Sequence, residues 1–153
     1  MSPGETGQTS ADDRIVMCAE NVHEGMRLGP VRYVVSQEQI SGFAASIGSR
    51  NLLYTGGGAV APPTMRLNDY ALLIATHFRG GKGGVHARHW CEFHEPMRAG
   101  QAVRVEGVFT STVRKRGKFY FTLEYETRDE ASGQLLVRQA ITSVLLNPKG
   151  EMA

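Results

Sequence analysis

The sequence has few cysteines, no long apolar run and almost no net charge. Its two cysteines make no disulfide framework, so a reducing compartment, the cytoplasm, is expected. No segment approaches the ~18 apolar residues of a membrane span, and the N-terminus lacks the apolar part of a signal peptide, so we expect neither membrane insertion nor export. The formal charge of +2, with 17 basic residues interspersed among 15 acidic ones, does not favour a nucleic-acid partner.

The remaining composition is typical of one globular domain. A chain of 153 residues with 41% apolar side chains is long enough to bury a sizeable core. Residues 1–13 are polar and have nothing to bury, so we predict a disordered tail there and a single domain over 14–153.

The spacing of apolar residues over 36–48 predicts the helix around which the rest of the chain is organised. Ser36 and Gln39 form a capping box at its start, and Gly48 is a natural residue to end it. We expect this helix to lie buried in the concave face of a sheet, with Phe43→Ala costing about 3–5 kcal/mol. The apolar face at i, i+3, i+4 and i+7 consists of Ile40, Phe43, Ala44 and Ile47.

A second, shorter helix is predicted in the connector that follows. It begins at Pro63, near the first helical position, and continues to about Phe78. Glycine clusters at 56–58 and 80–84 bound this connector, and neither has the pattern of a phosphate-binding loop.

The other segments are typical of strands. Val31–Val35 runs directly into the first helix, and the second half of the chain predicts a meander of four antiparallel strands joined by hairpins at 98–100, 115–118 and 129–133. These strands cover 85–97, 101–113, 119–127 and 134–146. The sequence therefore predicts an α+β fold in which an antiparallel sheet wraps one central helix.

Two separated motifs carry a resemblance to a known family. GSRNLLY and VAPPTM, within 48–65, resemble the GDxNPLY and VAPPTF run of the MaoC-like hydratases and dehydratases, and VHARHWCEFHEPMRAGQ at 85–101 resembles their strand-and-turn signature. The likeness is nearest to the dehydratase half-domain branch related to fungal-type fatty acid synthase. It implies a single hotdog domain that acts on acyl thioesters of coenzyme A or acyl carrier protein, adding or removing water across the 2,3 bond.

The resemblance also implies the position of the site. The family's loop carries an Asp, an Asn and a His, and the matching catalytic positions here are Ser49, Asn51 and Tyr54, of which only Asn51 is retained. Serine and tyrosine hydroxyls are not bases at neutral pH, so Ser49 is a bystander and the usual water chemistry lacks its base. The substrate pocket is expected beside Val60, Pro62, Pro63, Met65 and His86.

Two other clusters have alternative interpretations. His86 and His94 should point to one side of their strand, and His89 and Cys91 to the other, so we expect no metal, and no cofactor is implied. His86 or His94 is the alternative catalytic base. The basic turn at 114–118 either steers an acidic carrier protein or a phosphate, or is simply solvated.

Three functions remain open at this stage. The chain is an acyl-thioester hydratase, dehydratase or isomerase; or it is the non-catalytic subunit of a heterodimeric hotdog dehydratase; or its pocket takes another small molecule in specialised metabolism. In each case we expect a homodimer, or a heterodimer with another hotdog chain, because a sheet that wraps one helix leaves an exposed edge.

Overall fold

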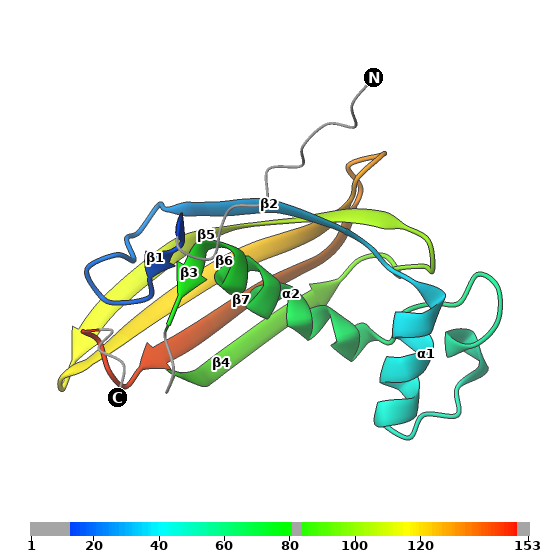
Figure 1. The fold of residues 1–153 in the computed structure, drawn as a ribbon, viewed down its shortest axis with the longest axis horizontal. Coiled ribbons are helices and arrows are strands. Elements are labelled where there is room, and N and C mark those ends of the chain that lie inside the picture. Colours follow the sequence, from blue (N-terminus) through cyan, green and yellow to red (C-terminus); the bar gives the residue numbers. More distant parts are fainter. Residues whose placement is uncertain (1–12, 81–83, 150–153) are drawn as a thin grey trace.

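The computed structural model describes residues 13–80 and 84–149. Residues 1–12 of the predicted tail over 1–13, and residues 81–83 of the glycine cluster, lie outside the described residues. A curved antiparallel sheet of five strands packs against one helix, and a second helix lies beyond one end of the sheet (Figure 1). The predicted α+β class is therefore confirmed. Along the described ranges, no helix is long and apolar enough to cross a membrane.

The elements follow the predicted order closely. They are β1 (Ile15–Val16), β2 (Arg27–Val34), α1 (Gln37–Ser46), the short 3₁₀ helices η2 (Leu52–Tyr54) and η3 (Pro63–Leu67), α2 (Asn68–His77), β3 (Phe78–Arg79), β4 (Gly84–Phe93), β5 (Ala102–Lys115), β6 (Lys118–Asp129) and β7 (Leu135–Leu145).

The sheet has the strand order β2-β5-β6-β7-β4, which differs from the predicted meander at one strand. Strands β5, β6 and β7 are joined by hairpins as predicted, but β4 pairs with β7 and not with β5. The hairpin predicted at 98–100 is therefore wrong. That segment pairs instead with the chain before η3, because Ala61 N–H donates to the Met97 carbonyl (2.7 Å) and Ala99 N–H donates to the Ala59 carbonyl (2.9 Å).

The central helix is α2, and the prediction that 36–48 fills this place is wrong. Helix α2 lies across the concave face of the sheet and packs against β2 and β5 (Figure 1). Leu73 of α2 is fully buried in the main core cluster, where it joins inward residues of the strands. The predicted alternation of β6 is confirmed in this cluster, which contains Phe119, Phe121, Leu123 and Tyr125.

Helix α1 has the predicted ends but covers a smaller core. The capping box is present, because Gln39 N–H donates to Ser36 Oγ (3.0 Å) and Ser36 N–H donates to Gln39 Oε1 (3.0 Å). Ile40 and Ala44 are buried, whereas Phe43 is half-buried and Ile47 is exposed. Ile40 joins a second core cluster beyond the end of α2, with Val35, Ala59, Ala61, Met97, Val103 and Leu136.

Strand β2 contains a bulge. The pairing of β2 with β5 shifts between Leu28 and Val31, around Gly29 and Pro30. Gly29 has φ +91°, and a Cβ there would lie 2.5 Å from the Val105 carbonyl oxygen, so only glycine fits. Proline is tolerated because β2 is an edge strand of the sheet.

Candidate functional site

The loop that carries the resemblance folds back on itself. Asn51 caps η2, because its Oδ1 accepts from Leu53 N–H (3.0 Å), and Ser49 Oγ accepts from Asn51 N–H (3.3 Å). Short polar side chains favour this local hydrogen bonding. It uses the side-chain oxygen of Asn51, Oδ1, and leaves the side-chain nitrogen, Nδ2, available as a donor. Residues 49–54 include no carboxylate and no imidazole, so the loop supplies hydrogen bonds without a neutral-pH base.

The loop is joined to the segment before η3. Val60 N–H donates to the Leu53 carbonyl (2.8 Å), and Tyr54 and Met65 both pack against the second core cluster. Pro62 is buried and Pro63 is exposed at the start of η3. The two segments predicted to form the pocket are thus adjacent in the fold.

His86, the remaining predicted pocket residue, lies elsewhere. It sits on β4, and its ring meets the edge of the Tyr70 ring with centroids 4.9 Å apart. Tyr70 and Ser143 share a buried hydroxyl hydrogen bond of 3.0 Å. These three residues line a cavity of about 480 Å³ between α2 and the sheet, together with apolar side chains that include Ile74, Phe121 and Leu145.

The histidines of β4 do not alternate as predicted, because a bulge interrupts the strand. The pairing of β4 with β7 shifts between His86 and Arg88, so that His86 opposes Ser143 and His89 opposes Ile141. Directly opposed side chains share a face, and Ser143 and Ile141 both point inward. His86, His89 and Cys91 therefore all lie on the inner face. Among the described residues, no group of three His, Cys, Asp or Glu side chains could hold a metal ion.

A buried polar network that sequence reasoning missed surrounds Gln139. The Gln139 Nε2 donates to the Arg66 carbonyl (3.1 Å), and the Oε1 accepts from Tyr125 Oη (3.2 Å). His89 Nε2 lies 3.0 Å and Cys91 Sγ 3.5 Å from the same oxygen. Burial raises the pKa of Tyr125 and of Cys91, so both groups keep their protons at neutral pH. The available signal was a polar residue at an inward position of β7, between the inward apolar residues Val137 and Ile141.

A second missed network lies at the start of α2. Asp69 is 3% exposed and accepts from Tyr33 Oη (2.6 Å) and Thr127 Oγ1 (2.5 Å). Burial raises the pKa of Asp69, although the two hydrogen bonds and the charge of Arg66 oppose this shift. Arg66 is 2% exposed, and its Nε and Nη1 have no hydrogen-bond partner within the described part of the chain. Burial lowers the pKa of this guanidinium.

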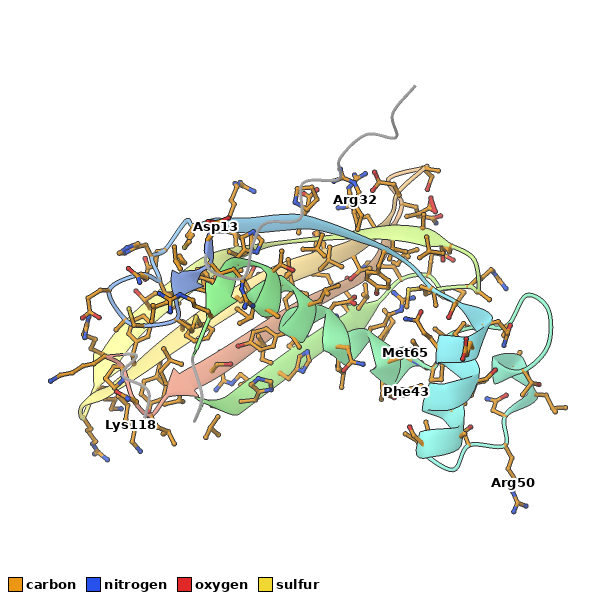
Figure 2. All side chains as sticks on the ribbon, in the orientation of Figure 1. Asp13, Arg32, Phe43, Arg50, Met65 and Lys118 are labelled. Atoms are coloured by element: carbon orange, nitrogen blue, oxygen red, sulfur yellow. The ribbon has the colours of Figure 1, made fainter. Side chains whose placement is uncertain are left out.

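The basic turn lies far from the loop that carries the resemblance. In Figure 2, Lys118 marks one end of the molecule, whereas Arg50, Phe43 and Met65 lie toward the other. Arg114 of this turn is paired with Glu20 (3.0 Å) and lies over the Phe119 ring. The turn is therefore not placed to steer a ligand into the loop at 49–54.

No protein-family model and no curated protein matches the chain. Several solved structures, in contrast, do match the chain. The HadBC (3R-hydroxyacyl-ACP dehydratase) complex of Mycobacterium tuberculosis aligns with a TM-score of 0.70 and 20% identity over 79% of this chain and 96% of that one. A MaoC-like dehydratase from Rhodospirillum rubrum aligns with a TM-score of 0.72 and 16% identity over 90% of this chain and 99% of that one.

An (R)-hydratase from A. caviae involved in PHA biosynthesis aligns with a TM-score of 0.69 and 17% identity, over 82% of this chain and 98% of that one. The chain thus has the hotdog fold of MaoC-like hydratases and dehydratases, as the resemblance predicted.

Proposed function

We propose that this hotdog protein is a hydratase/dehydratase-type enzyme that acts on acyl thioesters of coenzyme A or acyl carrier protein without the usual Asp and His dyad. The observation that carries the proposal is the hydrogen bond between Val60 N–H and the Leu53 carbonyl (2.8 Å). It joins the two parts of the first motif, GSRNLLY at 48–54 and VAPPTM at 60–65. Solved proteins of the same fold are named as hydroxyacyl-ACP dehydratases and (R)-hydratases, which supports this substrate class.

In this proposal, Asn51 and Tyr54 orient the thioester. The Asn51 amide nitrogen can donate to a carbonyl oxygen, and the Tyr54 hydroxyl can donate to the same group. Val60, Pro62, Pro63 and Met65 form the adjacent wall, and His86 contributes to the cavity beneath α2, which can hold an apolar chain. Ser49 occupies the family's Asp position and contributes only its bond to the Asn51 backbone.

The second candidate is a non-catalytic subunit that forms part of a pocket while another hotdog chain supplies the Asp and His. The absence of a carboxylate and an imidazole from 49–54 favours it. The HadBC structure is itself described as a complex.

The double variant Ser49→Asp/Tyr54→His tests the substrate class. It restores the family's dyad, so it should create or raise enoyl-thioester hydration, because general acid–base catalysis contributes roughly 10²–10⁴-fold. Hydration is measured by loss of the enoyl absorbance, and thioester binding is measured separately by calorimetry. Ser49→Asn/Tyr54→Phe is the matched control without titratable groups. Background hydration in a folded double variant that still binds the thioester would indicate a pocket rebuilt for another small molecule.

We also propose a dimer that pairs through β4. Strands β4 and β2 are the two edge strands of the sheet. Strand β4 carries three exposed apolar side chains, Val85, Trp90 and Phe93. Strand β2, at the other edge, contains a proline that cannot donate a hydrogen bond to a partner strand. Edge strands with unpaired backbone groups favour pairing between chains.

Sedimentation velocity at micromolar concentration should therefore give the mass of a dimer, alone or with a second hotdog chain. Phe93→Lys on β4 should shift the equilibrium to the monomer, whereas Val34→Lys on β2 should not. The two side chains have similar exposed fractions, 49% and 57%, which makes them a matched pair. A wild-type monomer under both conditions would contradict the pairing.

A further inference from the structure

The orientation of the Gln139 side chain follows from a single hydrogen bond. The Arg66 carbonyl oxygen can only accept, so the atom that lies 3.1 Å from it must be the Gln139 amide nitrogen. The Oε1 of this fully buried amide then faces His89, Tyr125 and Cys91. An amide oxygen only accepts hydrogen bonds and has two lone pairs, so the two shorter contacts, from His89 Nε2 (3.0 Å) and Tyr125 Oη (3.2 Å), are its donors, and Cys91 Sγ at 3.5 Å is a weak third.

This arrangement determines the tautomer of His89. Its Nε2 lies 3.0 Å from Gln139 Oε1, so Nε2 carries the proton and the neutral imidazole has its lone pair on Nδ1. No partner for Nδ1 occurs among the described residues, and the side chain is exposed on the inner face of β4. An imidazole oriented through one nitrogen, with the other nitrogen open, has the geometry of a general base.

His89 is connected through neighbouring residues to both regions in which the proposed function puts its substrate. On one side, Gln139 links it to the backbone of η3, whose Met65 packs with Tyr54 on the second core cluster. On the other side, the β-bulge puts His86 on the same face, and His86 lines the 480 Å³ cavity.

Two titratable groups, Tyr125 and Cys91, contact the same Gln139 oxygen as His89 does. The titratable groups near these are Tyr70 and Asp69 on α2 and Arg66 on η3. Burial raises the pKa of Tyr70, Tyr125 and Cys91, so these groups do not become anions near neutral pH. Burial also raises the pKa of Asp69 and lowers that of Arg66.

We infer that His89 is the general base that replaces the missing dyad; this inference rests on the proposed function. In hydration, Nδ1 takes a proton from water while the water oxygen bonds to C3 and the electron pair of the 2,3 double bond moves to C2. The imidazolium then returns the proton to C2. One water is added, and His89 ends neutral.

The experiment compares enoyl-thioester hydration in the wild type, His89→Gln and His23→Gln. His23 is the control, because it is an exposed histidine outside β4 that has no part in the proposed site. His89→Gln should lower kcat/KM by about 10²–10⁴-fold with thioester binding unchanged, and His23→Gln should not.

His89→Ala provides a second readout, since free imidazole should restore part of its rate. A purely structural role would not be rescued in this way. The inference is overturned if His89→Gln hydrates at the wild-type rate, or if a folded His89→Ala that binds thioester is not rescued. A wild type that binds thioester but does not hydrate it contradicts the proposed function itself, and the inference falls with it.

Discussion

Asp69→Ala is expected to lower the free energy of unfolding by about 3–5 kcal/mol. Removal of one partner from a buried charged network costs about this much, because the other charge stays buried without compensation. Here the remaining charge is Arg66, which is 2% exposed and already has two nitrogens without hydrogen-bond partners in the described structure. The hydroxyls of Tyr33 and Thr127 would also lose their acceptor. Urea unfolding followed by circular dichroism measures the change.

Asp69→Asn is the control for this prediction. The amide keeps one oxygen for Tyr33, and its nitrogen can donate to the Thr127 hydroxyl, so the loss should be smaller. The wild type should also lose stability as pH rises through the raised pKa of Asp69, because the folded state binds this proton more tightly than the unfolded state does. Asp69→Asn should lack this dependence. A loss below 1 kcal/mol in Asp69→Ala would show that the network does not stabilise the fold.

Phe109→Ala should cost about 3–5 kcal/mol, the range for removal of a phenyl ring from a packed core. Phe109 on β5 is fully buried, and its ring meets the edges of Phe78 and Phe121 at centroid distances of 6.1 Å and 5.4 Å. Phe43→Ala on α1 is the matched comparison. It removes the same ring from a half-buried site, so its cost should fall below that range.

Both variants are measured by urea unfolding under the same conditions. Equal losses would mean that Phe43 is as deeply packed as Phe109. That result would support the central position that the apolar spacing predicted for α1. It would contradict the assignment of α2 as the central helix.

Local signals in the sequence predicted local structure well. The capping box of Ser36 and Gln39, the helical turn that begins at Pro63 and the alternation over 119–127 all depend on residues that are close in the sequence. The turn at Pro63 is the 3₁₀ helix η3, and the α-helix α2 begins only at Asn68. The apolar spacing of 36–48 was equally clear, but it indicates only that a helix has a buried face. It does not identify the surface that covers this face, and here that surface is the smaller core cluster beyond the end of α2.

The site could be predicted only where it is local. The loop at 49–54 and the segment at 60–65 were identified together and are adjacent. In contrast, Gln139 bonds to Arg66 and Thr127 bonds to Asp69, and these partners are 73 and 58 residues apart. The inward position of His89 depends on one bulged residue in β4, which reverses the alternation and leaves no mark in the composition of the strand.

The place of β4 beside β7 also has a consequence for the order in which the protein folds. Strands β5, β6 and β7 follow one another in the chain and in the sheet, so their hairpins close over short stretches. Strand β4 is synthesised before all three but pairs with the last of them, and this contact closes a long loop. We therefore expect the strand that carries His89 to be among the last parts of the sheet to form, so that the contacts around Gln139 are completed late in folding.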